Sequence, residues 1–174
     1  MALHENWTFS QAVERTQELL DDITIKIDAK NLRIHLGSVS IDSLTPREFA
    51  VYMTLAELRA THAQVENAAG FLPAEISVAD EKAFTERVWK NYAPIRTKKS
   101  DNITLETWTK EEAGKSYSFF WARFAEDRSN ISKKFKKALG EHGKKFAITT
   151  KGKGKYRDKK YTLDISPKSI LIVK

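Results

Sequence analysis

The stretch from Arg128 to Lys160 concentrates the side chains that could do chemistry in this sequence. It holds thirteen lysines and arginines but only two acidic residues, Glu141 and Asp158. Its net charge is therefore +11, whereas the whole chain carries +7, so the remaining residues sum to −4. Ammonium and guanidinium groups gathered in one block are the groups that bind phosphates. This segregation favours a nucleic-acid surface over a basic face that serves solubility alone.

The first half of the basic stretch predicts a helix with one apolar and one basic side. Ile131 and Phe135 mark the buried side, and Gly140 ends the helix. Lys133 and Lys137 then project from the opposite side, the side that enters the major groove in a winged helix. Lysines there bind phosphates with little sequence information, whereas an asparagine on the flank could read adenine. The residues expected to contact nucleic acid are Arg128, Asn130, Ser132, Lys133, Lys136, Lys137, Lys151, Lys153, Lys155, Arg157, Lys159 and Lys160.

The second half of the basic stretch predicts a β-hairpin. Residues 146–150 form one strand, Gly152 and Gly154 permit the turn, and residues 161–165 return as the partner strand. Lysines along such a hairpin would follow the DNA backbone or the minor groove. A hairpin that follows a helix-turn-helix is a wing.

A helix over residues 116–127 precedes the basic helix. Tyr117, Phe120, Trp121 and Phe124 fall at i, i+3, i+4 and i+7, a spacing more typical of a buried helix face than of a base-stacking platform. A tight turn at Arg128–Ser129 would separate the two helices, with Ser129 or Asn130 as the next cap. Helix, short turn and helix make a helix-turn-helix.

Upstream, alternating apolar residues predict an antiparallel meander of three short strands over residues 23–27, 32–36 and 39–41. Thr45 and Glu48 then have the spacing of a capping box, with proline between them at the first helical position. The helix that follows is apolar on most sides, so it should be the central, buried one.

The remaining elements complete an α+β fold, a winged helix-turn-helix with an N-terminal strand meander and a C-terminal basic wing. A further helix is expected over residues 80–92, and residues 169–173 could add a last strand. We expect residues 1–22 to form an N-terminal helix or linker, and residues 23–174 to form the winged-helix domain with an insertion around residues 61–115.

Signals for other classes of protein are weak. His4, His35, His62 and His142 are scattered without metal-ligand spacing, and the chain lacks a nucleophile elbow, a Walker loop and a dinucleotide fingerprint. We therefore expect neither an enzyme nor a cofactor or metal. The absence of cysteine and of any long apolar run predicts a cytoplasmic protein without a membrane segment.

The order of strand meander, capped helix, helix pair and basic hairpin resembles the winged-helix output domains of response regulators. It resembles more closely the C-terminal winged-helix-like region of CRISPR-associated CARF proteins, a family associated with sensing or cleaving cyclic oligoadenylates. The segments that carry this resemblance are Phe9–Val13, Leu44–Tyr52, Ser132–Gly140 and Tyr161–Pro167.

The family's N-terminal CARF half has no counterpart in this sequence, so any ring-nuclease activity would belong to that half. Both an excised C-terminal domain and a stand-alone relative fit this pattern. The resemblance implies a role in antiviral defence. It leaves open whether the winged helix binds nucleic acid, most plausibly duplex DNA, or instead binds other CRISPR–Cas proteins or a second copy of itself.

Overall fold

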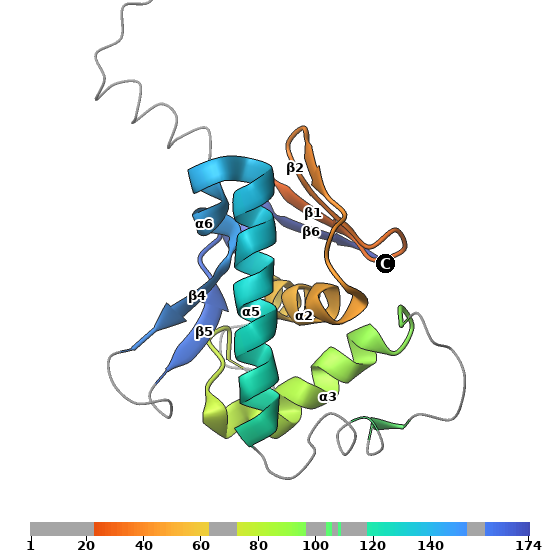
Figure 1. Ribbon diagram of the computed structural model, residues 1–174, viewed down its shortest axis with the longest axis vertical. Coiled ribbons are helices and arrows are strands. Elements are labelled where there is room, and N and C mark those ends of the chain that lie inside the picture. The colour runs from red at the N-terminus through yellow and green to blue at the C-terminus, as the bar shows by residue number, and fades with distance from the viewer. Residues whose placement is uncertain (1–22, 63–72, 97–103, 106–107, 109–117, 153–158) are drawn as a thin grey trace, which may run out of the picture.

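The structure of the 174-residue chain is a computed structural model that describes residues 23–62, 73–96, 104–105, 108, 118–152 and 159–174. The helix predicted near the N-terminus lies outside these residues, as does the proposed boundary at residue 22. What is described is a mixed α+β fold with a four-stranded sheet, a separate two-stranded hairpin and three long helices (Figure 1).

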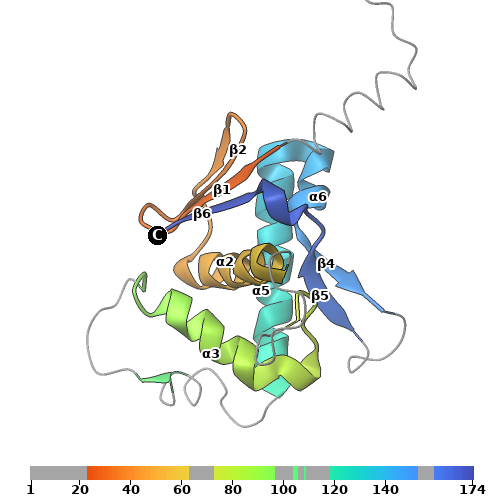
Figure 2. The same cartoon turned by 180° about the vertical axis from the view of Figure 1, so that it is seen from behind.

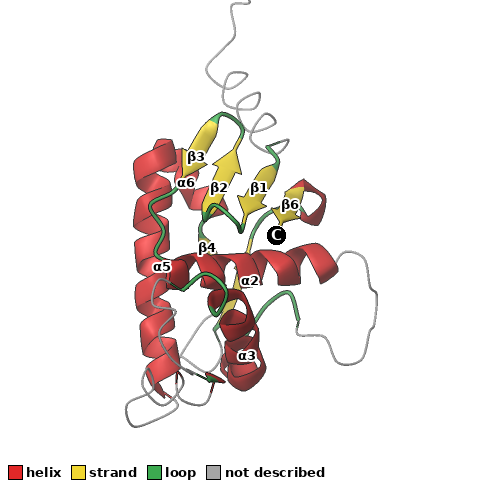
Figure 3. Ribbon diagram, turned by 90° about the vertical axis from the view of Figure 1, so that its right-hand side faces the viewer, coloured by secondary structure: helices red, strands yellow, loops and turns green. Residues whose placement is uncertain are grey.

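The four-stranded sheet contains the predicted meander and the predicted last strand. Its strands are β1 (Ile25–Asp28), β2 (Arg33–Leu36), β3 (Val39–Ile41) and β6 (Ile170–Val173). They lie in the order β3-β2-β1-β6, and β6 runs parallel to β1 (Figure 3). The turn between β1 and β2 is closed by the Asp28 carboxylate, which accepts hydrogen bonds from the backbone N–H and side-chain amide of Asn31. One face of this sheet is apolar and buried, as the alternation predicts.

Helix α2 (Pro46–His62) runs through the centre of the molecule. The predicted capping box is confirmed, because the Thr45 N–H donates to Glu48 Oε2 at 2.8 Å and the Glu48 N–H donates to Thr45 Oγ1 at 3.3 Å. Every residue from Phe49 to Ala56 is buried. The sheet lies on one side of α2, and α3 and α5 lie on others (Figures 1 and 2).

Helix α3 (Glu81–Tyr92) confirms the helix expected over residues 80–92 and packs against α2. A 3₁₀ turn, η1 (Val78–Asp80), precedes it, and the Asp80 carboxylate accepts hydrogen bonds from the backbone and hydroxyl of Ser77. Phe84 meets Phe124 of α5 edge to face, with ring centroids 5.8 Å apart. The three helices therefore share one core.

Helix α5 (Ser118–Leu139) is a single continuous helix, so the turn predicted at Arg128–Ser129 is wrong. The reason lies in the phase of the buried positions. Phe124, Ile131 and Phe135 are spaced by seven and four residues, so one apolar stripe continues through the supposed turn. Serine and asparagine favour caps, but packing along this stripe outweighs that preference. The predicted end at Gly140 holds, because this residue has φ +62°.

Beyond Gly140 the chain reverses and forms the predicted hairpin. A 3₁₀ turn, η2 (Gly140–His142), leads into the short helix α6 (Gly143–Phe146), and the strands are β4 (Ile148–Lys151) and β5 (Lys160–Leu163). Tyr161 of β5 also pairs with Ile76 through an isolated bridge. The hairpin stands beside α5 on the side away from the four-stranded sheet (Figure 2).

Candidate nucleic-acid interface

The outward side of α5 carries lysines, as the helical periodicity predicts. Ile131 and Phe135 are 0% exposed, whereas Lys133, Lys136 and Lys137 are exposed to solvent. Asn130 and Ser132 are half-buried on the flanks. The lysine-bearing side of the helix is therefore the side that is free to meet a large partner.

The inward side of α5 is held by the first turn of α2. Arg47 Nε donates to Asp127 Oδ2 at 2.8 Å, and the ammonium of Lys134 pairs with the Glu48 carboxylate. Glu48 thus caps α2 and binds α5 at the same time. Lys134 is therefore a cation of α5 that faces the protein.

Asp127 is a buried carboxylate with an altered proton affinity. Burial raises its pKa above the usual range, and the neighbouring Arg47 guanidinium lowers it by a smaller amount. Arg47 also lies over the Trp108 ring, 5.5 Å from its centroid. The docking of α5 on α2 therefore depends on a desolvated ion pair.

Arg128 joins α5 to the hairpin. Its guanidinium donates a hydrogen bond to the Thr150 hydroxyl of β4 and lies over the Tyr161 ring of β5, 5.4 Å from the centroid. We predicted this residue as a nucleic-acid contact from its place in the basic stretch. Its contacts fix the hairpin relative to the lysine-bearing helix, and the side chain stays half-exposed, so the predicted contact with nucleic acid stays a prediction.

The described part of the hairpin carries Lys151 and Lys160, both exposed. Their ammonium groups lie 3.0 Å and 3.7 Å from the Glu75 carboxylate, which precedes the Ile76 bridge. The hydrogen bond from Lys151 is the main reason that the pKa of Glu75 is lowered. Lys159 is half-buried, and Lys153, Lys155 and Arg157 lie outside the described residues.

Glu141 sits between two lysines where α5 ends. Its carboxylate lies 2.9 Å from the Lys136 ammonium and 2.6 Å from that of Lys144. Hydrogen bonds from Lys144 and then Lys136 lower the pKa of Glu141 to about 2. Lys144 is an exposed member of this surface that our site prediction omitted, although its spacing of three residues from Glu141 was a usable signal.

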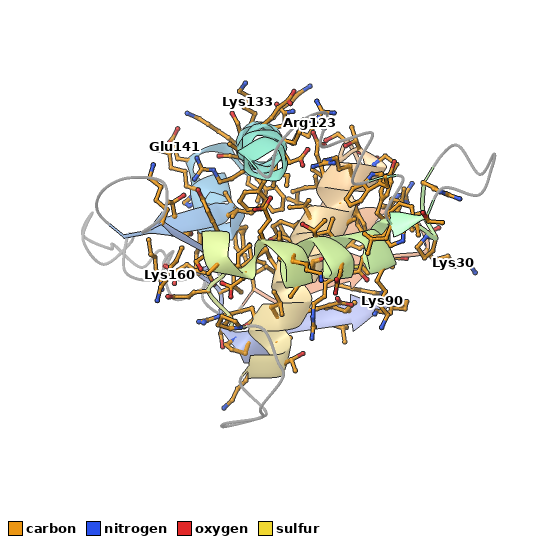
Figure 4. The ribbon with its side chains drawn as sticks, turned by 90° about the horizontal axis from the view of Figure 1, so that it is seen from below. Lys30, Lys90, Arg123, Lys133, Glu141 and Lys160 are labelled. Carbon is orange, nitrogen blue, oxygen red and sulfur yellow. The ribbon has the colours of Figure 1, made fainter. Side chains whose placement is uncertain are left out.

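In Figure 4, Glu141 and Lys160 lie on the left of the molecule, and Lys133 lies at its top. Among the described residues of the basic stretch, the exposed cations are Lys133, Lys136 and Lys137 on α5, Lys144 on α6, and Lys151 and Lys160 on the hairpin. We call these six lysines the basic surface.

Two other features are absent from the described ranges. These residues contain no group of three or more histidine, aspartate or glutamate side chains placed to hold a metal ion. Nor does any helix among them combine the length and apolar character needed to cross a membrane.

No protein-family model, curated protein or solved structure matches this chain. Its function must therefore be argued from the site itself.

Proposed function

We propose that this protein is a winged-helix module that binds nucleic acid, duplex DNA first of all, through the basic surface. The observation that carries the proposal is the two-sidedness of α5. Its apolar side and Lys134 are held by the protein, whereas Lys133, Lys136 and Lys137 face outward. Lysines on an outward helix face can reach phosphates on both sides of a major groove.

The order of elements supports the winged-helix part of the proposal. A helix (α2), a short bridge strand at Ile76, two further helices (α3 and α5) and a hairpin (β4–β5) follow one another along the chain. On this proposal α5 is the recognition helix and the β4–β5 hairpin is the wing. Arg128 would set the angle between the recognition helix and the wing.

Assignment to a CRISPR–Cas system rests on the sequence segments that resemble CARF-family proteins. In that setting the domain would place a defence protein on nucleic acid. The basic surface consists of lysines, which contribute affinity more readily than sequence choice. Selectivity would then come from Asn130 or from DNA shape.

The proposal is tested by binding a fluorescent DNA duplex to the wild type and to a Lys133→Glu, Lys137→Glu double variant. Reversing two charges on the recognition helix should abolish binding at physiological salt. A Lys26→Glu, Lys82→Glu variant makes the same change in net charge at exposed lysines on β1 and α3, and it should bind as the wild type does. Equal loss in both variants, or unchanged binding by the first, would refute the proposed face.

One observation favours a second candidate function, a protein-interaction or dimerisation module. Strand β6 is the end strand of its sheet, and its Leu171 and Val173 side chains are 50% and 40% exposed. Open edges with exposed apolar side chains pair readily with other strands. Light scattering that shows a wild-type dimer and a Leu171→Lys monomer would favour this candidate. A wild-type monomer that binds DNA would count against it.

A further inference from the structure

A second site lies away from the basic surface, where the β1–β2 turn meets α2 and the end of α3. It is a half-open pocket of about 500 Å³. Leu32, Met53 and Ile95 supply apolar walls, and Lys30, Lys90 and Lys174 stand around them. Pockets for small organic ligands commonly enclose about 300–1,000 Å³ and combine apolar walls with a few polar groups. Its size and lining thus suit a small molecule rather than a duplex.

The cations of the pocket come from three separate segments of the chain. Lys30 belongs to the β1–β2 turn and Lys90 to α3, and Lys174 is the residue that follows β6. None of the described residues that line the pocket is acidic. Lys174 is engaged by Glu57, whereas neither Lys30 nor Lys90 forms an ion pair within the described ranges. The charge that the pocket presents to a ligand is therefore positive.

The walls are held in place before any ligand arrives. Asn91 is buried, and its amide donates to Thr54 Oγ1 at 3.0 Å and to Glu57 Oε2 at 2.8 Å. The other Glu57 oxygen lies 2.7 Å from the Lys174 ammonium. Leu32 of the pocket wall adopts φ +53°, an uncommon conformation for a residue other than glycine. Such fixed walls lower the ordering cost of binding.

We infer that this pocket binds a small amphipathic anion, with an apolar or aromatic body against Leu32, Met53 and Ile95. A carboxylate, sulfonate or phosphate group would face Lys30 and Lys90. Figure 4 labels Lys30 and Lys90 on the side of the molecule away from Glu141 and Lys160. A ligand in this pocket would therefore bind apart from the hairpin and from Glu141, whether or not the protein binds nucleic acid.

Two dyes that differ by a single anionic group provide the test. 8-Anilinonaphthalene-1-sulfonate carries a sulfonate, and N-phenyl-1-naphthylamine has the same aromatic body without it. We expect saturable, one-to-one fluorescence enhancement with the sulfonated dye on the folded wild type. A Lys30→Gln, Lys90→Gln variant should bind the sulfonated dye about fivefold or more weakly than the wild type, since two charge contacts at the protein surface are lost. The affinity of the same variant for the neutral dye should differ from that of the wild type by less than twofold.

The matched control is a Lys26→Gln, Lys82→Gln variant, which removes the same charge outside the pocket and should bind both dyes as the wild type does. Thermal melting of each variant shows that it is folded at the assay temperature. Equal weakening of both dyes, an equal effect in the control variant, or no saturable binding to the wild type would overturn the inference.

Discussion

Replacing Arg47 with methionine should destabilise the protein strongly at neutral pH and less in acid. The change keeps a long side chain but removes the guanidinium whose Nε lies 2.8 Å from Asp127 Oδ2. The two side chains are 12% and 11% exposed, so Asp127 would remain buried without the cation that lowers its pKa most. Breaking a buried pair by removing one partner costs about 3–5 kcal/mol of unfolding free energy.

The pH dependence follows from the direction of the Asp127 pKa shift. Burial already holds this pKa above its unfolded value, and removal of Arg47 takes away a group that lowers it, so the folded-state pKa rises further. A carboxyl whose folded pKa exceeds its unfolded pKa binds the proton more tightly in the native state. Its unfavourable effect is absent below the unfolded pKa, about 3.9, and grows as pH rises toward the folded pKa.

Urea unfolding at about pH 7.5 and about pH 5 measures this dependence. The Arg47→Met cost should be smaller at the lower pH. The residual cost at the lower pH combines the part of the Asp127 effect that is already present above the unfolded pKa with the lost contact between Arg47 and Trp108, which does not titrate. An Arg47→Met, Asp127→Leu double variant removes both charges and should recover most of the stability. A cost below about 1 kcal/mol at neutral pH, or an equal cost at both pH values, would refute the reasoning.

Three further predictions concern the same framework. Tyr52→Phe removes the hydroxyl that donates to the buried Phe146 carbonyl at 2.8 Å, so urea unfolding should show a loss of about 1–3 kcal/mol; no loss would mean that water replaces the donor. Gly143→Ala would place a Cβ 2.5 Å from the Phe135 carbonyl oxygen, so the junction of α5 and α6 must shift. Urea unfolding should show a loss of about 1–3 kcal/mol in the free energy of unfolding. The control Ala138→Ser, on the exposed side of α5, should change it little. Glu141→Gln removes the carboxylate between Lys136 and Lys144, so the variant should bind DNA more tightly than the wild type. The gain should persist down to about pH 5, because the pKa of Glu141 is about 2 and its carboxylate is still ionised there. Weaker DNA binding by this variant would contradict the proposed role of the two lysines.

Much of the framework could be predicted from local chemistry. The capping box at Thr45 and Glu48 formed because both partners lie within one helical turn. Gly140 and Gly152 have φ +62° and +99°, so the end of the helix and the start of the hairpin turn were marked by residues suited to those backbone conformations. At these three boundaries, signals that depend only on neighbouring residues were therefore reliable.

The boundary within α5 and the partners of the charged residues could not be predicted in the same way. Ser129 and Asn130 favour a cap when considered locally, but the in-phase burial of Ile131 and Phe135 against α2 keeps the helix intact. The contacts of Arg128 with Thr150 and Tyr161 could not be predicted, because both partners are distant from it in sequence.

The same reasoning applies to the hairpin lysines. Glu75 meets Lys151 and Lys160 only because the Ile76 bridge brings the two segments together. Such contacts depend on tertiary packing, so they cannot be predicted from the spacing of residues in the sequence.

The salt dependence of duplex binding tests the central claim most directly. The slope of log affinity against log salt counts the phosphates that a protein neutralises, at about 0.9 per phosphate. If Lys133 and Lys137 each neutralise one, a Lys133→Ala, Lys137→Ala variant should bind with a slope about 1.8 smaller in magnitude than the wild type. A Lys26→Ala, Lys82→Ala variant should keep the wild-type slope. Equal slopes for the wild type and the Lys133→Ala, Lys137→Ala variant would show that the outward face of α5 does not contact DNA.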